Sequence, residues 1–485
     1  MASTLLSFVL ERAGEDEPAF VRESGEEMSY GSLALAVRAV VDMLVKAAPS
    51  ESGGSLLRRG IGVAVADQAG ALVAMLAAVG AGAAAVMLEL AGGEEAALAA
   101  AARAQVAAVV VGSLEDDTLR VIRGQSLREL DEAVALVVPT SGALGEPRAV
   151  MLSDLGVQAD IEAVVESLAL HRRSRTPLFL PLGSGSALIG QALATLRAGG
   201  ALLGLGALRG RERAGQALGA MARLRADAIL SEPTALHALA KAALERPIGV
   251  RPRLERICST GAPLLAETSA LLAEAFPGAR RINQYRLAEA LQVSAISDED
   301  PHFERGSVGR PLAGVSVRVV APDGAPLPPG ERGALEVRSP WQMLGYLDEP
   351  QATAGVLDDG WLRTGDLGRL DRDGYLYLDG RSDGLVKVAG ERVSLDALAE
   401  RLRAFDGVGA ACVIAAADPE LGVRLVAFIE PREGAPEDLA ERVRALAPAR
   451  LSPAWRPAKV VELSSLPRSG GEIDRQALRR MVEPT

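Results

Sequence analysis

Two charged residues stand at glycine-rich turns in the last third of the chain. The run Thr364-Gly365-Asp366 and the pair Gly380-Arg381 each set one charged side chain beside a glycine. We expect tight turns that present Asp366 and Arg381 at the ends of short strands. A carboxylate accepts two hydrogen bonds from a sugar diol, and an arginine adds donors that deprotonation never removes. A glycine-rich β-meander with surface charges would have the same pattern, so the pair alone does not decide between the two interpretations.

A second stretch combines glycines with hydroxyl groups directly after an apolar strand at 135–138. It runs Thr140-Ser141-Gly142-Ala143-Leu144-Gly145-Glu146-Pro147-Arg148. A loop that cradles phosphate needs close backbone approach and short donors, which Thr140, Ser141, Gly142 and Gly145 supply, and Arg148 adds a positive charge. Without further context, such a loop is more often a plain turn.

The elements that must position these residues follow an alternating pattern. Apolar strands alternate with helical segments through about residue 297, which predicts parallel-type sheets flanked by helices. From about residue 306 the pattern changes to short β runs and turns, and after Asp383 it becomes a compact α+β unit. We therefore expect an α/β chain with a large N-terminal domain at 1–382, which includes a β-rich part, and a small mobile C-terminal domain at 383–485. The strands expected before residue 297 are 61–65, 83–88, 106–111, 135–138, 176–180, 200–205, 228–230, 256–259 and 281–284.

Composition limits the classes of function. The formal net charge is −11 and no basic run is present, so a nucleic-acid partner is not expected. The two cysteines, Cys258 and Cys412, lie in apolar runs and are expected to be buried free thiols. The three histidines, His171, His237 and His302, are far apart in sequence, so neither a histidine triad nor a zinc site is expected.

One apolar stretch, Ala69 to Leu88, has about the length of a membrane span. It is built from alanine and glycine more than leucine, and Gly80 and Gly82 interrupt it. A buried helix, a turn and a buried strand are the preferred interpretation. The N-terminus does not resemble a signal peptide, so we expect a cytoplasmic protein without a membrane partner.

Taken in order, these motifs resemble the adenylate-forming superfamily of acyl-CoA synthetases, peptide-synthetase adenylation domains and luciferases. The resemblance covers nearly the whole chain. It implies that Asp366 and Arg381 hold the ribose of AMP, that the loop at 140–148 cradles phosphate, and that Asp383 is the hinge of the small domain.

The segment Asn283-Gln284-Tyr285-Arg286-Leu287-Ala288-Glu289-Ala290 resembles the family's Tyr-Gly-x-Thr-Glu element. The resemblance implies that Tyr285 stacks on adenine and that Glu289 holds Mg²⁺. Arg286 and Ala288 stand where the family has glycine and threonine. Arg286 would either replace the lost phosphate contact or block the nucleotide. The residues alone also fit a strand end followed by an alanine-rich helix.

Three further segments complete the resemblance. The turn 259–264, with Gly261 and Ala262, and the turn 181–185, with Ser184, resemble the segments that form the family's acyl pocket. By sequence alone, each is also a plain turn before a helix. Lys387 and Gly390 correspond to the part of the small domain that borders the pantetheine tunnel. We take Arg286, Glu289 and Lys387 as the candidate catalytic residues.

Three departures from the family pattern fall on groups that serve the ATP triphosphate. Ala143 and Leu144 replace hydroxyl residues, and Glu472 replaces the lysine that acts in adenylation. They favour a transferase that moves an acyl group, expected to be aryl, from acyl-CoA to the pantetheine thiol of an acyl carrier protein. Its cofactors would be coenzyme A or phosphopantetheine and AMP, with ATP and Mg²⁺ in doubt. An AMP-forming acyl- or aryl-CoA ligase and a non-catalytic binding or scaffold protein are the alternatives.

Overall fold

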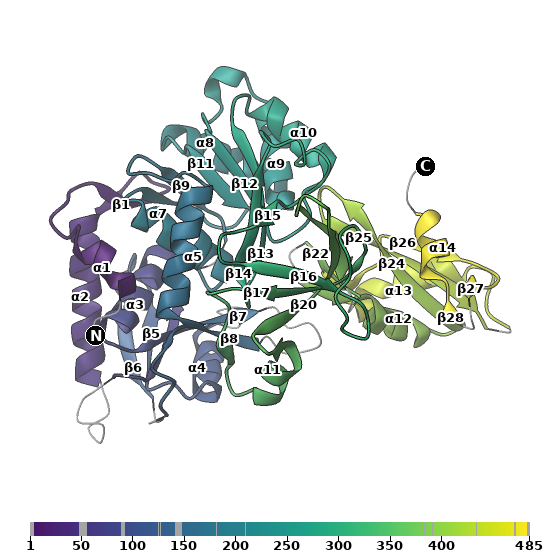
Figure 1. Cartoon of the computed structure of the whole chain (residues 1–485), viewed down its shortest axis with the longest axis horizontal. Coiled ribbons are helices and arrows are strands. Elements are labelled where there is room, and N and C mark those ends of the chain that lie inside the picture. Colours follow the sequence, from purple (N-terminus) through teal and green to yellow (C-terminus); the bar gives the residue numbers. More distant parts are fainter. Residues whose placement is uncertain are drawn as a thin grey trace.

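The computed structural model describes residues 4–47, 56–88, 93–124, 126, 128–140, 148–180, 182–208, 210–381, 384–389, 391–432, 434–469 and 472–482. A large α/β part is followed by a smaller part at the C-terminal end, as Figure 1 shows. This arrangement confirms the predicted fold class. The proposed hinge residue, Asp383, lies outside the described residues.

The first large sheet has seven strands in the order β18-β8-β7-β4-β3-β5-β6. Its central strands are parallel, and the flanking pairs β7–β8, β8–β18 and β5–β6 are antiparallel. The strands are β3 (Gly60–Val65), β4 (Ala84–Met87), β5 (Ala108–Gly112), β6 (Arg120–Arg123), β7 (Val134–Thr140), β8 (Arg148–Ser153) and β18 (Gly345–Tyr346). The helices of this region are α1 (Thr4–Leu10), α2 (Tyr30–Ala47), α3 (Gln68–Gly80), α4 (Gly93–Arg103) and α5 (Asp154–Ser167).

Helix α3 and strand β4 form the apolar stretch that has the length of a membrane span. Every residue from Ala69 to Val79 is buried, and β4 is buried throughout. Asp67 caps α3 by accepting a hydrogen bond of 2.6 Å from the amide of Gly70. The stretch is therefore a buried helix, a turn and a strand, as predicted. Among the described residues, no helix combines the length and the apolar character that a membrane crossing needs.

Two further sheets make up the rest of the alternating region. One has the order β2-β1-β10-β9 and the other β11-β12-β13-β14-β15. Pairs β1–β10, β10–β9, β11–β12 and β12–β13 are parallel. The strands are β1 (Pro18–Arg22), β2 (Glu27–Ser29), β9 (Arg175–Leu178), β10 (Ala201–Gly204), β11 (Ala228–Ser231), β12 (Arg256–Thr260), β13 (Arg280–Leu287), β14 (Leu291–Ser297) and β15 (Arg310–Pro311). The helices are α6 (Gly185–Ala187), the π-helix η2 (Leu188–Leu193), α7 (Ala194–Arg197), α8 (Gly210–Arg223), α9 (Pro233–Leu244), the 3₁₀ helix η3 (Ile248–Val250) and α10 (Ala266–Ala275).

The β-rich part carries the residues with which the sequence analysis began. Its sheet has the order β16-β17-β20-β19, with β21 paired to β20. Its elements are β16 (Ser316–Val320), β17 (Gly333–Arg338), α11 (Pro350–Val356), β19 (Leu357–Asp358), β20 (Trp361–Leu370) and β21 (Leu376–Arg381).

The small part has its own buried core, built mainly on α12, β24, β25 and α13. It also contains two hairpins, β22–β23 and β27–β28, and a last helix, α14, that the sequence analysis did not predict. Its elements are β22 (Leu385–Val388), β23 (Glu391–Ser394), α12 (Leu395–Arg403), β24 (Val408–Asp418), β25 (Gly422–Pro431), α13 (Leu439–Arg450), η4 (Pro453–Trp455), β26 (Lys459–Glu462), β27 (Arg468–Ser469), β28 (Glu472–Ile473) and α14 (Arg475–Arg480).

Two local expectations differ from the structure. Between β5 and β7, where no strand was predicted, the short edge strand β6 pairs with β5. The alanine-rich helix considered after Tyr285 does not form, because β13 continues to Leu287 and returns through a turn as β14. Leu291, which opens β14, adopts a positive φ of 54°, and the pairing of the two strands outweighs the helix propensity of the alanines.

Candidate active site

Asp366 and Arg381 face each other on neighbouring antiparallel strands, β20 and β21. The Nη1 atom of Arg381 donates a hydrogen bond of 3.0 Å to Oδ1 of Asp366. Asp366 is 8% exposed, and its own amide donates to the hydroxyl of Thr364. The glycine between them, Gly365, adopts a positive φ of 74°. The structure therefore brings together the carboxylate and the guanidinium that the sequence analysis selected.

Tyr285 on β13 completes this cluster from a different sheet. Its hydroxyl donates a hydrogen bond of 2.5 Å to Oδ2 of Asp366, and the side chain is buried. Burial, together with the negative charge of Asp366, raises the pKa of Tyr285 well above its ordinary value. The hydroxyl consequently stays protonated and holds the carboxylate in place. The stacking of its ring on adenine stays a prediction.

A second cluster gathers around Tyr346 at the end of the first large sheet. Its hydroxyl donates a hydrogen bond of 3.0 Å to Oε1 of Glu289, and the guanidinium of Arg148 lies 5.1 Å from its ring centroid. Arg148 pairs with Thr140 across strands β7 and β8, at the two ends of the loop 141–147. Arg148 and Glu289 thus both contact Tyr346, and Thr140 lies beside Arg148 on the next strand. Tyr346 was not among the predicted site residues, although Gly345, with a positive φ of 150°, directly precedes it.

Seven of the predicted residues lie outside the described part of the chain: Ser141, Gly142, Ala143, Leu144, Gly145, Asp383 and Gly390. For Glu472 the structure gives the backbone only, which pairs with Ser469 in the β27–β28 hairpin. Figure 1 shows this hairpin at the outer end of the small part, away from β20. In this arrangement of the two parts, the hairpin does not reach the Asp366 cluster.

Arg286 has a different partner from the one expected. Both Nη atoms of its guanidinium donate to the carboxylate of Asp160 on α5, and the two side chains are 2% and 0% exposed. The backbone amide of Gln292 donates a further bond of 2.9 Å to Asp160. A fully buried guanidinium needs such a counter-charge, so Arg286 is committed to Asp160. This geometry does not support the expected role of Arg286 as a catalytic cation.

Lys387 lies at the contact between the small and the large part. Its ammonium forms an ion pair with Glu232, which directly follows β11. A Cβ added to Gly261 would lie 3.7 Å from Oε1 of Glu232 and 3.9 Å from Nζ of Lys387, so the three residues lie together. Ala262 follows in the same turn, half-buried. Ser184 directly precedes the short helix α6 and makes no side-chain cap bond to it.

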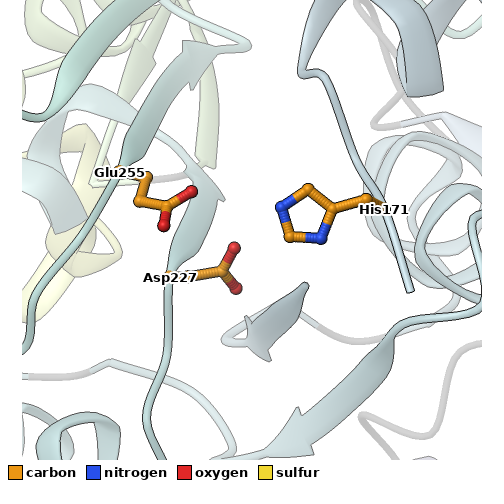
Figure 2. A group of neighbouring side chains, drawn as sticks. All are labelled: His171, Asp227 and Glu255. Carbon is orange, nitrogen blue, oxygen red and sulfur yellow. The ribbon is translucent and has the colours of Figure 1, made fainter. Parts of the chain in front are cut away.

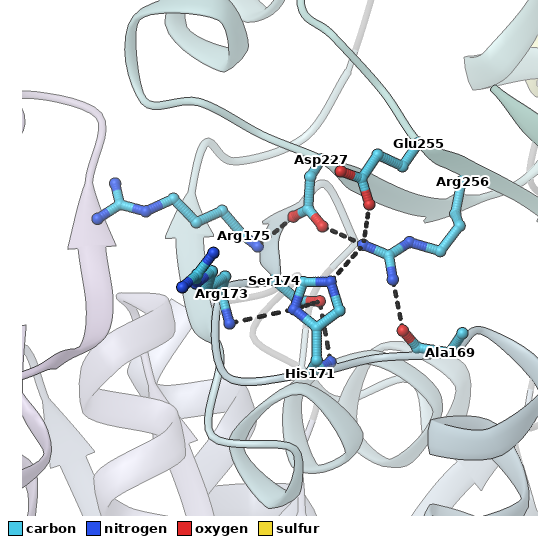
Figure 3. Close-up of polar contacts among 8 residues, drawn as sticks. All are labelled: Ala169, His171, Arg173, Ser174, Arg175, Asp227, Glu255 and Arg256. Atoms are coloured by element: carbon cyan, nitrogen blue, oxygen red, sulfur yellow. Dashed lines mark hydrogen bonds and ion pairs between the residues drawn. The ribbon is translucent and has the colours of Figure 1, made fainter. Parts of the chain in front are cut away.

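A further cluster has the residue types of a metal site. His171, Asp227 and Glu255 offer ligand atoms that lie within 4.8 Å of one another, and Figure 2 shows them facing a common space. Figure 3 shows that Nη2 of Arg256 meets all three: it pairs with Asp227, with Glu255 at 3.1 Å and with Nε2 of His171 at 3.4 Å. A guanidinium already takes the place of a cation, so this cluster is an ion-pair network rather than a metal centre.

Both cysteines are buried and unpaired, as predicted. Burial raises the pKa of Cys258 to about 12 and also raises the pKa of Cys412. A thiol with such a pKa stays protonated at neutral pH and is a poor nucleophile. Neither cysteine is therefore suited to form a covalent intermediate.

A large α/β part with this cluster, followed by a small α+β part, defines the class of adenylate-forming enzymes. The chain belongs to the AMP-binding enzyme family, whose main domain matches residues 9–347 and whose C-terminal domain matches residues 398–471. It is 30% identical to a feruloyl-CoA synthase of Amycolatopsis sp over 349 residues, which cover 72% of this chain and 70% of that protein. It is 31% identical to a sulfoacetate–CoA ligase of Cupriavidus necator, over 72% of this chain and 67% of that protein.

Among solved structures, the chain is similar to the amide bond synthetase McbA from Marinactinospora thermotolerans. The TM-score is 0.74 at 27% identity, over 98% of this chain and 99% of that chain. The curated relatives are named as CoA ligases and CoA synthases. They favour the ligase alternative over the acyl transfer that the sequence analysis preferred, and they give no support to the doubt about ATP and Mg²⁺.

Proposed function

We propose that this protein is an AMP-forming ligase that joins a carboxylic acid to coenzyme A at the expense of ATP. The observation that carries the proposal is the carboxylate of Asp366, held by Arg381 and Tyr285 from two different sheets. A fixed acceptor with two oxygens suits the vicinal diol of a nucleotide ribose. The names of the relatives support the ligase activity.

In the first half-reaction, a carboxylate oxygen of the acid would attack the α-phosphorus of ATP and pyrophosphate would leave. The cluster of Thr140, Arg148 and Glu289 would serve the phosphate side of the nucleotide, with Arg148 supplying positive charge. Glu289 offers a half-buried carboxylate that Tyr346 holds in place, and this suits an oxygen-binding cation such as Mg²⁺. A protein promotes a reaction at phosphorus mainly by positioning the reactants and by compensating the negative charge.

In the second half-reaction, the thiol of coenzyme A would attack the carbonyl carbon of the acyl-adenylate, and AMP would leave. We infer that the thiol enters beside Gly261, where Lys387 and Glu232 bring the two parts of the protein together. We also propose a cytoplasmic location, because unpaired thiols are typical of a reducing compartment.

Two other activities are candidates besides the ligase. Transfer of an acyl group from acyl-CoA to a carrier-protein pantetheine thiol, without ATP, is the activity that Ala143, Leu144 and Glu472 favour. With an amine as acceptor of the acyl-adenylate, the protein would be an amide bond synthetase, which the similarity to McbA favours as a second candidate.

The test is a product assay with purified protein, ATP, MgCl₂, a panel of carboxylic acids and one acceptor at a time. We expect AMP and a CoA thioester in equal amounts when coenzyme A is the acceptor. Amide formation with ammonium or an amine, at a rate above that of the thioester, would favour the second candidate. Transfer from an acyl-CoA to a carrier protein without ATP would contradict the ligase proposal.

A further inference from the structure

Strand β13 separates the Asp366 cluster from a second group of polar side chains. Successive residues of a strand point to opposite faces. Tyr285 reaches Asp366 on one face, so Gln284 lies on the other. The register of β13 against β14 shifts after Tyr285, and the side chain of Arg286 turns away from Asp366 toward Asp160 on α5. Thr260 pairs with Gln284 across the parallel strands β12 and β13 and shares its face. Ligands of open α/β sheets bind outside the carboxyl ends of such strands, and β12 ends at Thr260.

The pair of Arg286 and Asp160 closes this face on the side of α5. The π-helix η2 passes so near that a Cβ added to Gly190 would lie 3.3 Å from Cζ of Arg286. The guanidinium therefore fills the space between β13, α5 and η2. A group bound at the ends of β12 and β13 would therefore contact the Arg286–Asp160 pair. A shorter side chain in place of Arg286 would leave space there.

The remaining polar atoms on this face lack partners within the described part of the chain. They are the hydroxyl of Thr260 and both amide atoms of Gln284, on side chains that are 1% and 3% exposed. Buried polar groups are normally hydrogen-bonded, and a buried group without a partner asks for an explanation. An apolar ligand would leave these atoms without partners, and a polar ligand would satisfy them.

We propose that the acyl group of the substrate lies against Thr260 and Gln284 and ends at the Arg286–Asp160 pair. The enzyme would then select short carboxylic acids that carry a second hydrogen-bonding group, such as a hydroxyl or another carboxylate, and would discriminate against flat aryl acids. Arg286 is on this account a residue that determines specificity. The inference rests on the proposed ligase function and names its substrate class.

The test compares glycolate and malonate with benzoate and ferulate as acids in CoA-thioester formation. For the unmodified enzyme we expect kcat/KM to be at least about tenfold higher for one of the short acids than for either aryl acid. Binding of the same acids, measured by thermal shift in the presence of AMP, reports on the pocket without catalysis. Aryl acids used as well as the short acids would overturn the inference and leave the ligase function intact.

The double variant Arg286→Ala/Asp160→Asn removes the charged pair without leaving one buried charge alone. We expect it to gain activity toward benzoate and lose the preference for short acids. The matched control is Arg281→Ala/Asp298→Asn, which removes another ion pair of the same strand, of 2.8 Å, and should keep the preference. If the double variant does not fold, the comparison of the four acids with the unmodified enzyme still tests whether the pocket prefers short polar acids.

The outcomes separate the two claims. If short polar acids bind but none is activated, the ligase proposal fails and the assignment of the pocket stands. If none of the four acids binds and none is activated, both fail. An unchanged preference in the folded double variant would exclude Arg286 as the residue that determines specificity.

Discussion

At the scale of single residues, Asp366 is the side chain on which the proposed nucleotide site depends. It is nearly buried, and its two oxygens accept hydrogen bonds from Arg381 and from Tyr285. A carboxylate oxygen can accept more than one hydrogen bond, which suits a ribose diol. The two protein donors fix the orientation of the carboxylate.

The substitution Asp366→Asn tests this role. An amide keeps the shape of the side chain but offers one acceptor oxygen instead of two, and it removes the charge. Hydrogen bonds to charged groups contribute about 1.5–3 kcal/mol, so we expect the affinity for AMP to fall about 10- to 100-fold. Isothermal titration of AMP measures the change. The control is Asp379→Asn on the same hairpin, where the carboxylate pairs with Arg369 and Arg332. Equal affinities in all three proteins would remove Asp366 from the site.

The contacts that could not be predicted from the sequence join residues far apart in the chain. Arg286 stood out because it replaces a glycine of the family pattern, but its partner Asp160 is 126 positions away and no local pattern links them. Glu232 and Lys387 are 155 positions apart and meet only through the packing of the small part. Asp366 and Arg381 were predictable because a hairpin joins them and a glycine stands beside each.

At the scale of elements, the packing of α9 against α10 carries a buried histidine. His237 is 1% exposed, and its Nδ1 lies 3.1 Å from the hydroxyl of Thr268, while its Nε2 has no partner among the described residues. Burial lowers the pKa of His237 below its ordinary value of 6.5, and the nearby Lys241 lowers it further. The imidazole is therefore held neutral between the two helices.

This burial predicts a loss of stability in mild acid. Between the lowered folded pKa and 6.5, the unfolded chain binds more protons at His237 than the folded chain does. The free energy of unfolding should consequently fall as the pH drops below about 6.5. Urea unfolding at a series of pH values measures the slope. We expect His237→Asn to reduce the slope and the control Thr268→Val to keep it. Identical slopes for the native protein and His237→Asn would show that His237 does not cause the loss of stability.

The β27–β28 hairpin, which carries Glu472, is the element that best distinguishes the ligase from the acyltransferase. By the resemblance in sequence, Glu472 would take the place of the family's adenylation lysine, and the ligase proposal needs the hairpin to approach the nucleotide. We expect Glu472→Lys to raise the rate of acyl-adenylate formation, because a repulsion from phosphate becomes an attraction. A gain of about 1.4 kcal/mol in the transition state gives about a tenfold rise. Single-turnover kinetics measures it. The same charge change at the exposed Glu441 is the control, and equal effects at both sites would exclude a local role.

The elements themselves followed from the sequence wherever apolar runs were long. Strands β3, β5 and β12 lie within a few residues of their predicted bounds. The hairpins β22–β23 and β27–β28 were missed because each strand has no more than four residues and carries charged side chains. Such short strands form because the surrounding structure brings them together. Their own residues do not show the apolar alternation that would predict a strand.

At the scale of the whole molecule, the two parts meet through charged contacts. Lys387 pairs with Glu232, and Lys241 pairs with Glu420 at 2.6 Å. The second pair is largely exposed, and pairs of this kind contribute about 0–1 kcal/mol. The small part has its own core of buried residues. Contacts of this strength suit a part that changes position during a reaction with two half-reactions.

Limited proteolysis tests the proposed hinge at Asp383. We expect early cleavage near residues 382–384 and a C-terminal fragment that resists further digestion, because α12, β24, β25 and α13 pack on each other. Mass spectrometry of the fragments gives the cleavage site. Early cuts inside β24 or β25, with no such fragment, would show that the small part is not an independent unit.

The most direct test of the central claim is ATP–pyrophosphate exchange in the absence of coenzyme A. This reaction isolates the first half-reaction, in which a carboxylic acid attacks ATP. The account predicts exchange that requires both the acid and Mg²⁺ and that falls at least about tenfold in Asp366→Asn, because each 1.36 kcal/mol of lost stabilisation lowers a rate tenfold. The ligase function would be contradicted if the protein catalysed no exchange with any acid but moved an acyl group between thiols without ATP.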